Sequence, residues 1–108
     1  MKLGIIEFID CAHFLPGHAK CGSVHGHTYR IEIVVEGELK DGMLLDFKDL
    51  KSKAREVLSD YDHRHWNDVL DYPSVENICQ LLHTRLGARL ALPFALRVFE
   101  GNGKWAEL

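Results

Sequence analysis

The sequence has 108 residues, of which 46% are apolar and 27% charged, and its formal net charge is -3. We expect one globular domain over residues 1–108, because this length and this balance are typical of one domain. The small net charge and the absence of any long run of like charges argue against a nucleic-acid-binding protein.

The first predicted element is a strand over residues 3–14, which are rich in strand-forming residues and carry no helical stripe. Glu7 interrupts this apolar run, which is therefore too short for a signal peptide, and no stretch of the sequence is long enough to span a bilayer. The cysteine count is three, an odd number that argues against a disulfide framework. We therefore expect a cytoplasmic protein with free thiols.

A loop follows at residues 16–24, and a second strand begins at His25. Apolar and polar residues alternate along this strand to about Leu39, which predicts one buried face, formed by Tyr29, Ile31, Ile33 and Val35. The segment "KDG" then predicts a turn, and residues 43–47, "MLLDF", predict a short strand.

From Lys48 the apolar residues recur at helical spacing, which predicts a helix to about Ser59. Residues 60–72 look irregular and polar. A second helix begins after Ser74, which is suited to be its N-cap. The segments "FALRVFE", "GNG" and "KWAEL" predict a strand, a turn and the second strand of a hairpin.

This order of elements predicts an α+β fold, ββααββ, in which a four-stranded antiparallel sheet carries two helices on one face. Two helices cover only one face, so the other face or the sheet edges must meet another surface. A second copy of the chain is the natural candidate, and we expect a homo-oligomer.

Histidines cluster in the first quarter of the sequence. His25 and His27 are separated by one residue, so they project from the same face of a strand and can converge on one metal ion. Antiparallel pairing across the intervening loop could bring His13 alongside as a third ligand. Cys21, in the loop, could be a fourth, structural ligand, or a thiolate that acts as a base or nucleophile. The alternative is that His25 and His27 are ordinary surface residues of a strand.

Six segments together resemble the family of 6-pyruvoyl-tetrahydropterin and 6-carboxy-tetrahydropterin synthases. They occur in the family's order and cover almost the whole chain: "FIDCAH", "CGSVHGHTY", "DFKDLK", "YDHRHWND", "PSVEN" and "LRVFE". The short gap between Cys21 and His25 is more similar to the carboxy-tetrahydropterin branch. The resemblance implies the tunnelling fold (T-fold), with a hexameric ring of two stacked trimers and active sites at the subunit interfaces.

The resemblance also implies roles for the residues at the metal. It implies zinc as the cofactor, bound by His13, His25 and His27, with Cys21 as a proton-abstracting base beside it. Asp62 and His63 correspond to a second acid/base pair. Adjacent residues do not face each other on a regular element, so this segment must be kinked or the pair must come from two subunits. Without the resemblance, Asp62 would be expected to cap a turn and His63 to be solvated.

Three further residues correspond to the family's pterin contacts. Glu100 maps onto the carboxylate that anchors the pterin through two N–H donors, and Ser74 and Glu76 map onto a second contact segment at a helix N-terminus. The default alternatives are an exposed glutamate at a strand end and, for Glu76, a carboxylate favoured by the helix dipole. Cys11 and Cys79 are expected to be packed core thiols.

The implied function is a zinc-dependent lyase. It would convert 7,8-dihydroneopterin triphosphate to 6-carboxy-5,6,7,8-tetrahydropterin with loss of acetaldehyde and triphosphate, on the queuosine or 7-deazaguanine route. The alternatives are pyruvoyl-type triphosphate elimination, side-chain cleavage to a 6-hydroxymethyl pterin, and a non-catalytic zinc- or pterin-binding module. Family variants built for the cleavage tend to carry glutamate in place of the cysteine, so Cys21 counts against that outcome.

Overall fold

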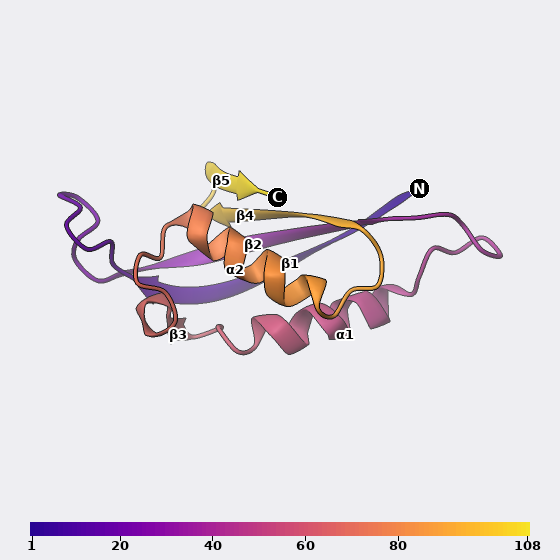
Figure 1. Ribbon diagram of the computed structural model, residues 1–108, viewed down its shortest axis with the longest axis horizontal. Helices are drawn as coiled ribbons and strands as arrows, with labels where there is room; N and C mark the ends of the chain where they lie inside the picture. The colour runs from indigo at the N-terminus through magenta and orange to yellow at the C-terminus, as the bar shows by residue number, and fades with distance from the viewer.

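A long antiparallel hairpin forms the centre of the structure, a computed structural model that describes residues 1–108. Strand β1 (Lys2–His13) pairs with β2 (His25–Glu36) along its whole length, and His13 lies opposite His25. The connecting loop occupies one end of an elongated molecule that measures 53 × 23 × 20 Å (Figure 1). Both predicted strands are confirmed, and their register brings the predicted ligands level with one another.

The sheet has five strands in the order β3-β1-β2-β4-β5. Strand β4 (Phe94–Glu100) pairs with β2, and β5 (Lys104–Glu107) returns along β4 after a short turn, as predicted. Strand β3 (Arg64–His65) was not predicted, and it lies parallel to the end of β1. The fold class is confirmed, but the sheet is one strand larger and not wholly antiparallel. Two residues are too few to show an alternating pattern in the sequence.

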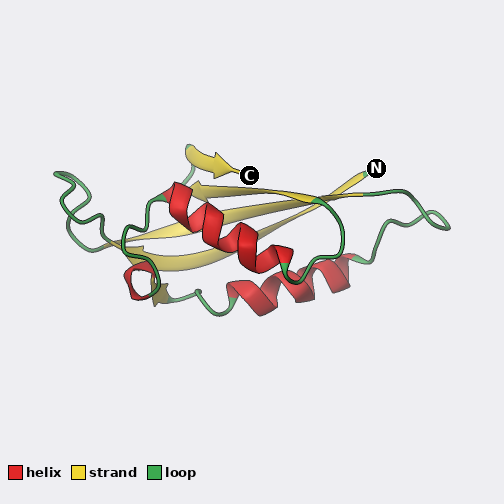
Figure 2. Ribbon diagram, viewed as in Figure 1, coloured by secondary structure: helices red, strands yellow, loops and turns green.

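Helices α1 (Phe47–Leu58) and α2 (Val75–Gly87) cover one face of the sheet, and a 3₁₀ turn η1 (Trp66–Asp68) lies between them in the chain (Figures 1 and 2). Side chains cap both helices: Asp46 accepts from the Lys48 N–H at 2.8 Å, and Ser74 accepts from the Asn77 N–H at 3.2 Å. These caps satisfy N–H groups that have no partner within the helix.

The strand predicted at residues 43–47 is wrong. Met43 makes only an isolated bridge with Lys40, and Phe47 already belongs to α1. Of the four apolar residues that suggested a strand, three are consecutive and so do not alternate; Leu44 and Leu45 pack against the core from a loop.

The core lies between the helices and the inward face of the sheet. Odd-numbered residues of β1 and β2 point into it, and Tyr29, Ile31 and Ile33 are completely buried. The opposite face of β1 carries Ile6 and Phe8, whose exposed fractions are 48% and 53%. The chain thus leaves one face of its sheet uncovered, as its helix count predicted. None of its helices has the length and apolar character that crossing a membrane requires.

Candidate functional site

Three histidine rings meet where the β1–β2 hairpin reaches the 14–24 loop. The ring centroids of His13 and His25 are 4.6 Å apart, those of His13 and His27 5.1 Å, and those of His25 and His27 4.8 Å. One nitrogen from each ring lies within 4.8 Å of the other two. The antiparallel register and the two-residue period of β2 place all three on the helix-facing side of the sheet.

Backbone carbonyls fix the orientation of two of these rings. His13 Nδ1 lies 2.8 Å from the carbonyl oxygen of Pro73, and His25 Nδ1 lies 2.7 Å from that of Ser23. A carbonyl only accepts, so each Nδ1 must carry the hydrogen and donate it. Each Nε2 then bears a lone pair, and these two atoms face each other at 3.0 Å.

Two lone pairs in such proximity repel each other unless a cation lies between them. His27 adds a third nitrogen of the same kind: its Nε2 is buried and forms no hydrogen bond. Burial lowers the pKa of His27, with His13 and His25 acting in the same direction and the nearby Glu100 opposing it, so the ring favours its neutral, metal-binding form. A ligand imidazole whose other nitrogen donates to a carbonyl is the usual arrangement around zinc. The residues present therefore fit a divalent ion with three histidine ligands.

Cys21 lies near this cluster in sequence but outside it in space. Its half-buried thiol is not among the groups whose ligand atoms lie within 4.8 Å of one another. The His18 ring organises the loop around it, because His18 Nδ1 accepts from the N–H groups of Lys20 at 3.2 Å and of Cys21 at 2.9 Å. A side chain at Gly22 would approach the His18 carbonyl to 2.6 Å, so this turn requires glycine. Sequence reasoning missed the role of His18 as a cap within the loop.

Glu100 ends β4 beside the histidines. Its Oε1 lies 3.4 Å from His27 Nε2, without hydrogen-bond geometry, and 3.7 Å from Lys104 Nζ. Lys104 faces Glu100 across the β4–β5 pair. Only 15% of the Glu100 side chain is exposed, so it is not an ordinary glutamate at a strand end. The short turn "GNG" between the two strands could have predicted that Lys104 lies opposite Glu100.

The second predicted pterin segment lies at the start of α2. Pro73 provides the carbonyl that holds His13, which places this helix end at the edge of the histidine cluster. The Ser74 hydroxyl is occupied as the N-cap, and the exposed Glu76 lies in the first turn of the helix. The cap and the dipole account for these two residues without a ligand.

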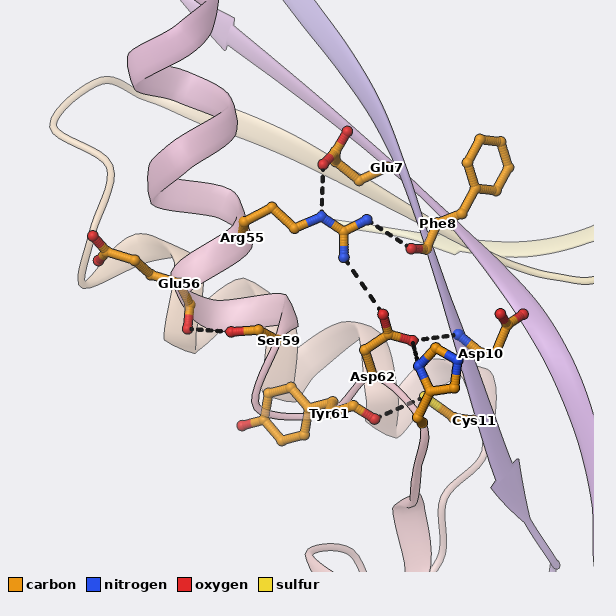
Figure 3. Close-up of polar contacts among 10 residues, drawn as sticks. Glu7, Phe8, Asp10, Cys11, Arg55, Glu56, Ser59, Tyr61 and Asp62 are labelled. Carbon is orange, nitrogen blue, oxygen red and sulfur yellow. Dashed lines mark hydrogen bonds and ion pairs between the residues drawn. The ribbon is translucent and has the colours of Figure 1, made fainter.

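Asp62 and His63 form a separate cluster with Asp10. His63 Nδ1 lies 3.0 Å from Asp62 Oδ1. The same oxygen also accepts the Asp10 N–H at 2.9 Å (Figure 3). His63 has a φ of 60°, and this left-handed conformation is the kink that lets two adjacent side chains meet. The pair thus forms within one chain.

His63 and His27 line the same open concavity, which has a volume of about 650 Å³. The His63 side chain is 78% exposed, so its second ring nitrogen is free to reach a bound molecule. His13 and His25 do not line this concavity, so His63 offers an oriented imidazole at the surface while the three histidine rings meet on the helix-facing side of the sheet.

Comparison with known proteins identifies the family. Residues 3–108 match the family model for 6-pyruvoyl tetrahydropterin synthase. The chain belongs to this family. A relative from Archaeoglobus fulgidus, named "Putative 6-carboxy-5,6,7,8-tetrahydropterin synthase", is 39% identical over all of this chain and 95% of its own length.

Two further comparisons bear on activity and on fold. A protein of Pyrococcus furiosus named "Dihydroneopterin monophosphate aldolase" is 39% identical over 88 residues, which are 79% of this chain and 77% of that protein. The structure of Caenorhabditis elegans 6-pyruvoyl tetrahydropterin synthase superposes with a TM-score of 0.90 over 100% of this chain and 94% of that one. Their identity is 20%, so this likeness concerns the fold, and it confirms the predicted tunnelling fold.

Proposed function

We propose that this member of the 6-pyruvoyl tetrahydropterin synthase family is a zinc-dependent lyase. Its substrates are 7,8-dihydroneopterin triphosphate and water, and its products are 6-carboxy-5,6,7,8-tetrahydropterin, acetaldehyde and triphosphate. The observation that carries the proposal is the set of three converging imidazole nitrogens, two of them with lone pairs fixed by backbone carbonyls. The full-length relative from Archaeoglobus fulgidus supports the carboxy product.

His13, His25 and His27 would hold the zinc, which when bound would polarise substrate hydroxyls and lower their pKa. The Cys21 thiolate accepts a proton from the substrate beside the metal. The Glu100 carboxylate accepts the ring N–H and the exocyclic amine of the pterin together, with Ser74 and Glu76 at its margin.

The Asp62–His63 pair supplies the second proton-transfer group. His63 Nδ1 donates to Asp62 Oδ1, so the carboxylate selects the tautomer whose Nε2 has a free lone pair. That Nε2 takes up a proton in one step and returns it in another. Its exposure leaves it able to act on substrate bound at a subunit interface.

The assembly we propose is a homohexamer of two trimers. It is supported by the uncovered face that carries Ile6 and Phe8 and by the edge of β1, which pairs with β3 only at Cys11 and Ala12. Exposed apolar surface and open strand edges are features that neighbouring subunits cover.

The decisive experiment incubates zinc-loaded protein with 7,8-dihydroneopterin triphosphate and identifies the products by mass spectrometry. We expect the carboxy pterin with acetaldehyde. Triphosphate release without carbon loss would instead indicate pyruvoyl-type elimination. A 6-hydroxymethyl pterin would indicate side-chain cleavage, a second candidate favoured by the similarity to the Pyrococcus furiosus aldolase.

The matched variant is Cys21→Ala. If Cys21 is the catalytic base, the Cys21→Ala variant should lose turnover and still bind zinc and pterin. A wild-type protein that binds pterin without converting it would be a non-catalytic binding module, and the lyase proposal would be wrong.

A further inference from the structure

Arg55 links helix α1 to strand β1 and to Asp62. It lies in the last turn of α1, and each of its three guanidinium nitrogens has a different partner (Figure 3). Nε donates to Glu7 Oε1 at 2.9 Å, Nη2 donates to the Phe8 carbonyl at 2.8 Å, and Nη1 lies 3.7 Å from Asp62 Oδ2. The side chain thus bridges the buried face of the sheet, the edge of β1 and the proposed catalytic pair.

Glu7 is an unusual residue for its position. It occupies the core-facing side of β1 between Ile5 and Ile9 and is only 7% exposed. Arg55 is its close partner, since the exposed Lys51 lies farther away at 3.9 Å. The Arg55 side chain is 41% exposed, so the pair is only partly buried, and replacing such a pair by apolar residues is often neutral for stability. Stability alone therefore does not explain why this pair occupies the sheet face.

Asp62 is held on both of its carboxylate oxygens. Oδ1 accepts from the Asp10 N–H and faces His63, while Oδ2 faces Arg55. The backbone N–H of His63 also donates to the backbone carbonyl of Asp10 at 2.7 Å. The backbone groups of Asp10 therefore anchor the pair at one point, and Arg55 holds the carboxylate from the other side.

We propose that Arg55 is a positioning residue that fixes the orientation of the Asp62–His63 pair, and that Glu7 holds Arg55 in place. The inference rests on the proposed function, in which that pair transfers protons. Arg55 touches neither the metal ligands nor the pterin contacts, and it acts only through Asp62.

The test compares Arg55→Gln and the double variant Glu7→Leu/Arg55→Leu with wild type. A small displacement of a catalytic group slows turnover strongly, so we expect kcat to fall about 10-fold in both variants. KM and zinc content should stay at wild-type values. The double variant should keep its Tm, because apolar residues replace both charges. A loss of kcat without a loss of Tm is a result that a merely structural role does not produce.

Arg89→Gln is the matched control. Arg89, just after the end of α2, pairs with Glu56 of α1 at 2.6 Å, and this ion pair does not involve Asp62. Its removal should leave kcat unchanged.

The inference and the proposed function fail in different ways. If wild type converts no pterin, the proposed function fails. If wild type is active and His63→Ala loses turnover but Arg55→Gln keeps it, only the positioning role is refuted. An increase in KM at constant kcat would also overturn it, since Arg55 would then bind substrate. If kcat and Tm fell together in both variants, the positioning role would also be refuted, because the loss of activity would then follow from the loss of stability.

Discussion

The environments of the three cysteines differ, and this decides which thiol is available for chemistry. Burial raises the pKa of the Cys11 thiol to about 12, and its Sγ donates to the Tyr61 carbonyl at 3.1 Å. Burial also raises the pKa of Cys79, whose Sγ lies 3.6 Å from the Ala106 carbonyl. Both are the packed core thiols that the sequence predicted, and Cys21 alone is partly open to solvent.

We predict that a thiol-alkylating reagent at pH 7 modifies Cys21 first. With a pKa of about 12, only about one Cys11 thiol in 100,000 is ionised at that pH, and the thiolate is the reactive form. Peptide mapping by mass spectrometry after brief labelling would identify the site, and labelling in denaturant should reach all three thiols. Fast labelling of Cys11 in the folded protein would contradict the structure.

The histidine cluster predicts a specific loss on mutation. His25→Ala removes one of three nitrogens, and we expect zinc affinity to fall more than about 100-fold, beyond the loss usual for outer-shell partners. Competition with a chelator would measure it. His83→Ala is the control, because His83 stacks on Phe94 and lies outside the cluster. Equal zinc affinity in His25→Ala and wild type would rule out the proposed ligand set.

At the scale of elements, the start of α2 is positioned by its cap. The Ser74 hydroxyl accepts from the Asn77 N–H, and the adjoining Pro73 carbonyl receives the His13 N–H. The cap therefore stabilises the same helix end that orients a proposed metal ligand.

We predict that Ser74→Ala lowers the free energy of unfolding by about 1 kcal/mol, because loss of an N-cap hydroxyl leaves a helix N–H without its partner. Chemical denaturation would measure it. Ser52→Ala is the control: it removes the same hydroxyl from an exposed position within α1, and it should not lower stability. Unchanged stability of Ser74→Ala would show that the cap contributes nothing.

Elements with a clear period were predictable from the sequence, and elements made by distant contacts were not. The alternation of β2 and the helical spacing of α1 mark their buried faces directly. Strand β3 exists only because Arg64 and His65 pair with a strand far earlier in the chain. Residues 43–47 look like a strand because they are apolar, but loop packing against the core explains that composition.

The candidate site also has parts that the sequence predicts and parts that it does not. The spacing of His25 and His27 and the hairpin register were enough to bring His13 to them. The contacts of the Pro73 and Ser23 carbonyls with the histidine rings were not predictable, because every residue has a backbone carbonyl and the sequence does not show which ones meet a ring. The link from Glu7 through Arg55 to Asp62 depends on where α1 packs, which local patterns do not specify.

At the scale of the whole molecule, the face of the sheet away from the helices has no cover within the chain. The Phe8 ring points away from α1 and is 53% exposed (Figure 3). Removing such apolar surface from water is the main favourable contribution to subunit association.

We predict that Phe8→Asp lowers the mass of the particle in solution, because a carboxylate on this face opposes burial by a neighbouring subunit. Size-exclusion chromatography with light scattering would measure it. Met43→Asp, at a similarly exposed position in the 37–46 loop, should leave the mass unchanged. A monomeric wild type at micromolar concentration would contradict the proposed assembly.

The left-handed backbone conformation at His63 means that stability and the proposed activity favour different residues at this position. Glycine adopts this conformation with little strain, whereas a side chain with a Cβ is disfavoured there. Laboratory evolution for heat resistance alone should therefore replace His63 readily. If His63 transfers protons as proposed, such variants would be more stable and inactive, so a screen for heat resistance must also select for product formation.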